Sequence, residues 1–341
     1  MPSPLRQYTT HHDTFGIWHV PNIKLLYPGN HSKSWYIRTN SLGMRDDREF
    51  AHAKPEGARR VLLFGDSFAF GSGVEVGERY SNLLEQTHSN IEIMNFGVGS
   101  TGVDRQYLIY QYLGKNFDSD ILMICPYLNN VARCTGTHSI YQDRGGRLIR
   151  KPKPHYTIED GRLVLKNVPV PREPADRDNG NIGEATVDAE QHMIGQNQFS
   201  LKATFIRKFF LYSNYKYWLI KLLPIQPYPE YNSASNPTWL LGKRILREFS
   251  KKYGKTTIIA PIPSWSIIMN PKLATYRQRF AELHDPQNGV HVIDILPYFL
   301  TLSFRDRKEC FLSKYDYHYS AAGHRVTAEA LSSELTKINL L

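Results

Sequence analysis

The chain has 341 residues, 41% of them hydrophobic and 22% charged, a composition typical of soluble globular domains. Its formal net charge of +10 is compatible with anionic substrates, nucleic acids or membrane surfaces and selects none of them. Three cysteines without a C-x-x-C pair argue against a disulfide framework or a zinc ribbon. The first residues lack the apolar segment of a signal peptide, and no apolar run reaches about 18 residues, so we expect a cytoplasmic protein without a membrane-spanning helix.

Residues 1–58 are polar and rich in turn-forming residues, which predicts an irregular arm that packs on the main domain. Within this arm, His11 and His12 are adjacent and could ligate a metal ion. Two neighbouring side chains rarely face one ion, so we interpret both histidines as exposed to solvent.

The segment that follows the arm combines a buried strand with a serine at its end. Residues 61–64 are four consecutive apolar residues, which predicts a strand buried on both faces. Gly65 and Asp66 end this strand, and Ser67 is the first hydroxyl residue after it. Ligands bind at the carboxyl ends of parallel strands, so Ser67 is a candidate nucleophile. The alternative is an ordinary helix N-cap.

A second strand is predicted over 91–96 and leads into residues 97–102, which formally match the G-x-G-x-x-G pattern of dinucleotide-binding sites. That interpretation requires an acidic residue at the end of the next strand, where it would bind the ribose hydroxyls. The next predicted strand, 121–125, ends in Cys125-Pro126 instead. We therefore expect no nucleotide cofactor.

The region 132–236 leaves the alternation of strands and helices and is predicted to be an insertion. Asp160-Gly161, between two extended segments, predicts a β-hairpin. Residues 171–196 are polar and predict a loop. The basic, aromatic segment 199–223 could lie on a membrane or cover an acyl chain. We favour a helix pair docked on the domain, and a role as a lid that selects substrates fits either interpretation.

From residue 237 the alternation resumes, with further strands predicted over 256–260 and 290–294. The predicted helices cover 78–88, 103–114, 238–253, 271–284 and 321–338. Five strands joined by crossover helices predict an α/β fold, a three-layer αβα sandwich around a five-stranded parallel, flavodoxin-like sheet with the first strand in its centre. This core would comprise 59–131 and 237–341.

Near the end of the chain, Asp316 lies two residues before His318, just ahead of the last predicted helix. An acid and a histidine are the orienting group and the base that a weak serine nucleophile requires. His324 is the competing histidine, but it lies in the first turn of that helix without an adjacent acid, so we prefer His318. The spacing of the two histidines matches no zinc site, and we expect no metal.

Together, Gly65-Asp66-Ser67 and Asp316-x-His318 resemble the SGNH (GDSL) hydrolase superfamily, in blocks that cover about half of the chain. Residues 38–48 also resemble the segment that precedes the first block in a bacterial subset of these hydrolases. The resemblance implies acyl transfer through a covalent ester on Ser67, with His318 as base, Asp316 orienting it, and no cofactor. The backbone N–H of Ser67 would form part of the oxyanion hole.

The family completes this oxyanion hole with a glycine N–H from the second block and an asparagine side chain from a G-x-N-D block. The matching positions here are Ser100, with Gly99 as the fallback, and Asn129. Tyr127 and Asn130 depart from the flanking glycine and aspartate of that pattern. An asparagine pair at a strand end is otherwise a common turn.

We therefore predict a serine ester hydrolase that removes a small acyl group, such as acetyl, from a carbohydrate or another polar metabolite. The sequence lacks the G-x-S-x-G elbow of α/β-hydrolases. An O-acyltransferase that uses the same acyl-enzyme is the first alternative, and a catalytically silent binding protein is the second. Only the net charge points to nucleic acid, so we expect no such partner, and membrane contact is not favoured.

Overall fold

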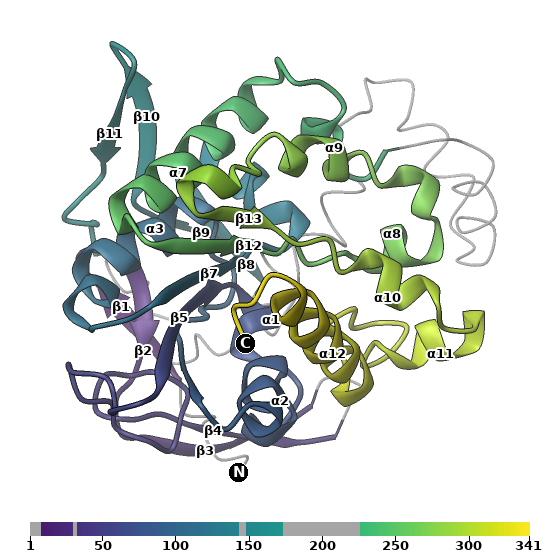
Figure 1. The fold of residues 1–341 in the computed structure, drawn as a ribbon. Helices are drawn as coiled ribbons and strands as arrows, with labels where there is room; N and C mark the ends of the chain where they lie inside the picture. The colour runs from purple at the N-terminus through teal and green to yellow at the C-terminus, as the bar shows by residue number, and fades with distance from the viewer. Residues whose placement is uncertain (1–7, 30–32, 143–147, 173–225) are drawn as a thin grey trace.

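The computed structural model describes residues 8–29, 33–142, 148–172 and 226–341 (Figure 1). Within them lies a five-stranded sheet in which every neighbouring pair of strands is parallel. In sheet order the strands are β13 (Val290–Val292), β12 (Thr256–Ile259), β7 (Ile121–Cys125), β5 (Arg59–Gly65) and β6 (Ile91–Asn95). The predicted parallel, flavodoxin-like sheet is therefore confirmed.

Helices cover both faces of this sheet (Figure 1). The α-helices among the described residues are α1 (Ser67–Phe70), α2 (Tyr80–Thr87), α3 (Val103–Tyr112), α7 (Pro237–Tyr253), α8 (Trp265–Met269), α9 (Tyr276–Ala281), α10 (Leu296–Leu300), α11 (Phe304–Glu309) and α12 (Ala321–Lys337). Short 3-10 helices are η1 (Val76–Glu78), η2 (Gly114–Asn116), η3 (Leu128–Asn130), η4 (Ala132–Thr135), η5 (Pro229–Tyr231), η6 (Pro271–Leu273) and η7 (Pro286–Asn288). Helices α3 and α7 pack together on one face, and α2 and α12 pack together on the other.

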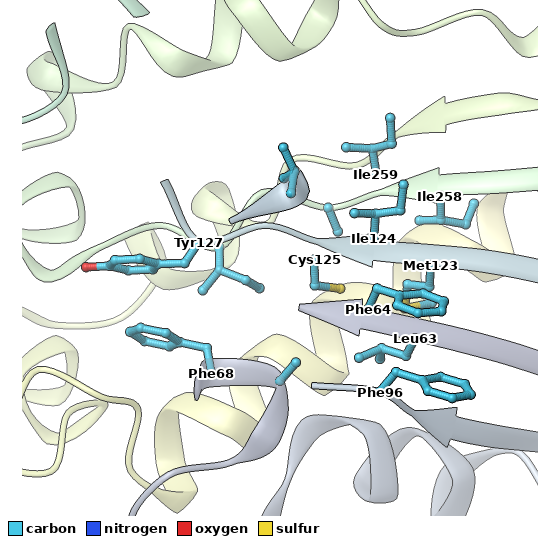
Figure 2. Close-up of a cluster of buried hydrophobic side chains, with 14 of the residues drawn as sticks. Leu63, Phe64, Phe68, Phe96, Met123, Ile124, Cys125, Tyr127, Ile258 and Ile259 are labelled. Carbon is cyan, nitrogen blue, oxygen red and sulfur yellow. The ribbon is translucent and has the colours of Figure 1, made fainter. Parts of the chain in front are cut away.

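The strands are apolar on both sides because both faces of the sheet are buried. Leu63 and Phe64 are fully buried, and the Phe64 ring contacts Tyr110 of α3 and Phe249 of α7. Figure 2 shows this core along the strands, with Phe68 and Tyr127 lying beyond the strand ends. The hydrophobic core therefore continues past the carboxyl edge of the sheet, where Ser67 lies.

The position of β5 differs from the prediction. The central strand is β7, whereas β5 is an internal strand between β7 and the edge strand β6. This arises because the chain goes outward from β5 to β6 and then returns past β5 to form β7. In doubly wound sheets ligands bind at such a point, where the strand order reverses. Ser67, directly after β5 and Asp66, lies at this switch point.

Most predicted helices are present, but the one expected over 271–284 is divided into η6 and α9. Ala274 between them has ψ of 49°, outside the helical range. The sequence analysis did not predict α8, α10 or α11, because each is too short for a helical pattern of apolar residues to repeat. The last helix begins where predicted, with the Ser320 hydroxyl accepting a hydrogen bond from the N–H of Gly323.

The arm was predicted to be irregular, and this was wrong for the described part. It contains two antiparallel hairpins, formed by β1 (Thr9–His12) with β2 (Gly16–His19) and by β3 (Lys24–Tyr27) with β4 (Trp35–Arg38). Burial alternates along β4, where Trp35 and Ile37 are buried and Tyr36 is exposed. The alternation covers only the four residues of β4, which is too few to indicate a strand from sequence. It nevertheless places both buried side chains in a cluster with Phe70 of α1.

Two further hairpins belong to the described part of the 132–236 insertion: β8 (His138–Gln142) with β9 (Leu148–Pro152), and β10 (His155–Glu159) with β11 (Arg162–Lys166). The hairpin predicted at Asp160-Gly161 is confirmed, and both turn residues have positive φ, 48° and 71°, as a type I′ turn requires. The segment 199–223 lies outside the described residues, as does most of the loop predicted over 171–196. Among the described helices, none is sufficiently long and apolar to cross a bilayer.

Candidate active site

The structure brings Ser67, His318 and Asp316 together in one hydrogen-bonded chain. The Ser67 Oγ lies 2.8 Å from Nε2 of His318, and Nδ1 of His318 lies 2.7 Å from Oδ1 of Asp316. Ser67 and His318 are buried, whereas the Asp316 side chain is 22% exposed. Ser67 and His318, 251 positions apart in sequence, are thus brought together with Asp316, as expected for a nucleophile, its base and an orienting acid.

The contact with Asp316 fixes the tautomer of His318. A carboxylate only accepts hydrogen bonds, so Nδ1 carries the proton and Nε2 accepts from the Ser67 hydroxyl. Asp316 is itself fixed by a tight turn, in which its Oδ1 also accepts from the backbone N–H of His318 and its own N–H donates to the hydroxyl of Ser313. His318 is therefore presented to Ser67 in the orientation that a general base requires.

Ser67 is the first residue of α1, a single helical turn held at both ends. Asp66 caps the start, because its Oδ1 accepts a hydrogen bond from the N–H of Phe68. At the other end the Arg45 guanidinium donates to the carbonyls of Phe70 and Gly71, at 2.8 and 2.7 Å. Arg45 belongs to the arm, so residues 38–48 help to hold the turn that carries Ser67.

Aromatic rings form a wall beside the base. The Phe68 ring stacks on that of Tyr127, with centroids 4.3 Å apart, and Figure 2 shows both rings. The Phe68 ring also lies 5.1 Å from the His318 ring. Next to His318 in the chain, Tyr317 stacks on Trp265 at 5.2 Å. The Phe68 ring limits the freedom of the imidazole, and the aromatic pairs add apolar surface near it.

The segment that follows β6 is attached to α1 and the end of β5. The Asn95 side chain donates to the carbonyl of Ala69, and the N–H of Val98 donates to the carbonyl of Gly65. A Cβ at Gly97 would lie 2.4 Å from the backbone nitrogen of Phe70, so only glycine fits there. The predicted second oxyanion block therefore packs directly against the helix that carries Ser67.

Within this block, Ser100 has φ of +59°, in the left-handed region that favours glycine. Gly99, the fallback position, is not among the residues with positive φ. Arg105 is buried and donates from Nη2 to the Ser100 carbonyl at 3.2 Å, a contact that helps to hold this turn. Ser100 thus adopts a backbone conformation that favours glycine.

Asn129 and Asn130 lie side by side in η3 but differ in their contacts. The Asn130 amide donates to Oδ2 of Asp66 at 2.7 Å and accepts from Nε2 of Gln106 at 2.8 Å. The Asn129 side chain, although buried, makes no hydrogen bond to any other described residue. Among the described residues its amide thus has no committed partner, which is compatible with the role predicted for it.

The sequence analysis missed Arg133 of η4. Its Nη1 lies 2.9 Å from Oδ2 of Asp66 and 3.4 Å from the carbonyl oxygen of Thr101. Asp66 is fully buried, and a carboxylate removed from water requires a cation or several donors. The sequence did contain one signal of this network, namely Asn130 in place of the aspartate of the G-x-N-D pattern. An ionised aspartate there would face Asp66 with no proton to donate, whereas the asparagine amide donates one.

The other candidate residues have structural roles. Burial, with the charges of Arg79 and Arg45 nearby, lowers the pKa of His324 to about 3, so its neutral imidazole accepts a hydrogen bond from the N–H of Tyr80. In the arm, His12 accepts bonds from the backbone of its own turn, and His11 contacts Asp13. No group of three or more histidine, cysteine, aspartate or glutamate side chains among the described residues could hold a metal ion.

No protein-family model and no curated protein matches the chain. Solved structures that resemble it include a member of the lipolytic protein G-D-S-L family from Veillonella parvula, at 11% identity with a TM-score of 0.44 over 82% of this chain and 100% of the other. A lipase from a goat rumen metagenome has 11% identity and a TM-score of 0.42 over 81% and 97%. A lipase/acylhydrolase from Enterococcus faecalis has 11% identity and a TM-score of 0.39 over 82% and 96%. These structural neighbours are thus a lipolytic G-D-S-L protein and two lipases, each of low sequence identity.

Proposed function

We propose that this chain is a serine ester hydrolase that acts through an acyl-enzyme on Ser67. The observation that carries the proposal is the hydrogen-bonded chain of Ser67, His318 and Asp316 at the switch point of the parallel sheet. A serine hydroxyl is a weak nucleophile, and it gains reactivity from a base that is itself oriented by an acid. All three groups are already within hydrogen-bonding distance.

In the proposed reaction, Oγ of Ser67 attacks the ester carbonyl carbon while Nε2 of His318 takes the hydroxyl proton. The tetrahedral intermediate collapses, the acyl group stays on Ser67, and His318 returns the proton to the departing alcohol. A water molecule, which gives its proton to His318, then attacks the acyl group on Ser67 in the same way, and the carboxylic acid is released as Ser67 regains its proton. Asp316 stabilises the imidazolium form of His318 in both halves without taking its proton.

The negative charge on the intermediate would be stabilised by the N–H groups of Ser67 and Ser100 and by the side chain of Asn129. Each such donor is typically worth about 3 kcal/mol of barrier. Two observations support this assignment: the left-handed turn at Ser100, and the Asn129 amide, which forms no hydrogen bond with another described residue. These donors are protein groups, and the proposed reaction uses no cofactor.

For the substrate we propose a small acyl ester, such as an acetyl ester, of a carbohydrate or another polar metabolite. The stacked rings of Trp265 and Tyr317, the latter next to His318 in the chain, support a carbohydrate, because flat amphipathic rings can pack against a sugar ring while their polar groups meet its hydroxyls. A Trp265→Ala variant should raise KM for acetylated sugars more than for p-nitrophenyl acetate. An equal effect on both substrates would remove this support.

The test of the proposed function compares wild type, Ser67→Ala and His318→Ala on p-nitrophenyl esters of increasing chain length. We expect each variant to lose at least about 10³-fold in kcat, and the double variant to be scarcely worse than either single one, because nucleophile and base act as a unit. A fluorophosphonate probe should label wild type and not Ser67→Ala. Turnover retained in folded Ser67→Ala would contradict the proposal.

The same assay separates hydrolysis from the two alternatives. Added sugar acceptors should leave the rate of acid release unchanged for a hydrolase, whereas an O-acyltransferase would divert the acyl group to the acceptor. A wild type that neither cleaves esters nor reacts with the fluorophosphonate would instead fit a catalytically silent binding protein.

A further inference from the structure

A buried carboxylate behind Ser67 connects the three segments that supply the proposed oxyanion donors. Asp66 is fully buried, and its Oδ1 accepts from the N–H of Phe68 in α1. Its Oδ2 accepts from Nδ2 of Asn130 at 2.7 Å and from Nη1 of Arg133 at 2.9 Å. The same nitrogen of Arg133 reaches the carbonyl of Thr101 at 3.4 Å.

Each proposed oxyanion donor is the chain neighbour of one member of this network. Ser67 follows Asp66, Ser100 precedes Thr101, and Asn129 precedes Asn130. The network therefore contacts all three donor segments without including a donor itself. A shift of Asp66 relative to Arg133 would change the spacing among the donors, on which stabilisation of an oxyanion depends.

The orientation of Asn130 is defined by its surroundings. Nε2 of the buried Gln106 donates to Oδ1 of Asn130, so the Asn130 amide presents its N–H group to Asp66. The backbone also leaves little room nearby. A Cβ at Gly102 would lie 2.9 Å from the carbonyl oxygen of Asn130 and 3.1 Å from Cβ of Arg133. The three segments are thus packed closely as well as hydrogen-bonded.

We propose that Arg133 is a positioning residue for the oxyanion hole, which it holds in register by joining the Asp66 carboxylate to the Thr101 carbonyl. This inference rests on the proposed serine hydrolase function. Arg133 suits the role because the two N–H bonds of its Nη1 lie in the plane of a rigid guanidinium and can donate to a carboxylate and a carbonyl at fixed relative positions, a geometry that a rotating lysine ammonium reproduces only in part. It acts through Asp66 and Thr101 and has no part in the proton transfers.

The test compares Arg133→Met and Arg133→Lys with Arg279→Met as a matched control. Arg279 also forms a carboxylate ion pair, with Glu282, and its side chain is 15% exposed against 14% for Arg133. Arg279 lies on α9, on a segment outside the network. The measurements are kcat and KM for p-nitrophenyl acetate, the inhibition constant of a boronic acid that forms a tetrahedral adduct on Ser67, and the urea midpoint of unfolding.

For a positioning role we expect Arg133→Met to lower kcat by about 10- to 100-fold, with KM changed by less than about threefold. The boronic acid should bind more weakly by a similar factor, because its adduct occupies the oxyanion hole. Arg133→Lys should recover part of this loss, and Arg279→Met should show no loss. Equal kcat and equal boronic acid affinity in folded Arg133→Met and Arg279→Met would overturn the inference.

Two further outcomes keep the test decisive. If Arg133→Met does not fold, a folded Arg133→Lys with wild-type kcat would show that Arg133 only neutralises Asp66, and the inference fails. If wild type itself shows neither turnover nor fluorophosphonate labelling, it is the proposed function that fails. The two proposals can therefore be contradicted separately.

Discussion

Two arginines hold the single turn that carries Ser67, one at each end, and they do so in different ways. Arg45, from the arm, donates to four backbone carbonyls, those of Tyr36, Phe70, Gly71 and Val74. Arg133, from η4, pairs with the carboxylate of Asp66. The Arg45 contacts supply donors to carbonyls at the end of α1 and thereby attach the arm to it. The Arg133 contact instead links separate segments that carry the proposed oxyanion donors. The arm end is therefore built for stability and the η4 end for alignment.

The surroundings of Arg45 support its role in stability. Its side chain is fully buried, with the guanidinium 4.4 Å from the Trp35 ring and 5.1 Å from the Phe70 ring. Burial, together with the charge of Arg79, lowers the pKa of Arg45 well below its ordinary value. Four carbonyl contacts and two rings thus replace water around a buried cation. Three of these carbonyls, those of Phe70, Gly71 and Val74, and the Phe70 ring belong to the core, so Arg45 joins the arm to it.

The largest effect that we expect from this comparison is that of Arg45→Met on stability. The variant removes the buried guanidinium that donates to four carbonyls, so the free energy of unfolding should fall by about 3–5 kcal/mol. Urea unfolding measures this loss. In the fraction that remains folded, kcat should stay within about threefold of wild type, because the proposed catalytic groups are unchanged. A stable variant with a 100-fold loss of kcat would reverse the roles assigned to the two ends.

Arg45→Lys serves as the control for charge. A single ammonium group cannot reach four carbonyls, so it should restore little of the lost stability. If it restores all of it, the positive charge rather than the shape of the guanidinium holds the arm.

The second prediction concerns the response of the arm to acid. His19 is buried against Phe70, with ring centroids 4.8 Å apart, and its Nδ1 contacts the carbonyl of Gly43. Burial lowers the pKa of His19 from 6.5 to about 4, the Gly43 carbonyl opposing this shift and the charge of Arg45 adding to it. Between these two values the unfolded chain binds more protons than the folded one. Stability is therefore lost as the pH falls from 6.5 to 4, by at most about 3 kcal/mol from this group.

Comparison with His19→Gln isolates this contribution. The pKa of His324 is lowered as well, so His324 also makes the fold less stable as the pH falls. The His19→Gln variant should therefore lose less stability than wild type on acidification, but still some. The measurement is the free energy of unfolding in urea at pH 7 and pH 4.5. If the change in the free energy of unfolding between the two pH values is the same in wild type and His19→Gln, protonation of His19 does not contribute to the loss of stability.

The core of this fold could be predicted from sequence because its signals are local. Four apolar residues before Gly65 define β5, and Ser320 defines the start of α12. Ser67, Asp316 and His318 were named as a set only because their motifs are distinctive, and the structure places them within hydrogen-bonding distance. Their catalytic roles remain a prediction.

What could not be predicted depends on contacts between distant residues. Arg45 lay inside a recognised segment, but nothing in the sequence indicates that its four acceptors converge on it. Arg133 lies 67 positions from Asp66, and a single arginine in an irregular segment carries no pattern. The place of β5 beside the edge strand was missed for a related reason, because the direction of each crossover is decided by the packing of whole helices.

The smallest expected effect concerns Ser100, which precedes the Thr101 carbonyl that Arg133 of η4 contacts. A left-handed conformation costs a serine about 1 kcal/mol relative to glycine, part of which is offset by the greater freedom of glycine in the unfolded chain. Ser100→Gly should therefore raise the free energy of unfolding by less than about 1 kcal/mol. Because the backbone N–H is retained, kcat for p-nitrophenyl acetate should stay within about twofold of wild type, and Ser100→Ala should match it in kcat while gaining no stability. A tenfold fall in kcat in both variants would assign the Ser100 hydroxyl, rather than its N–H, to the reaction, and the oxyanion hole would then differ from the one proposed.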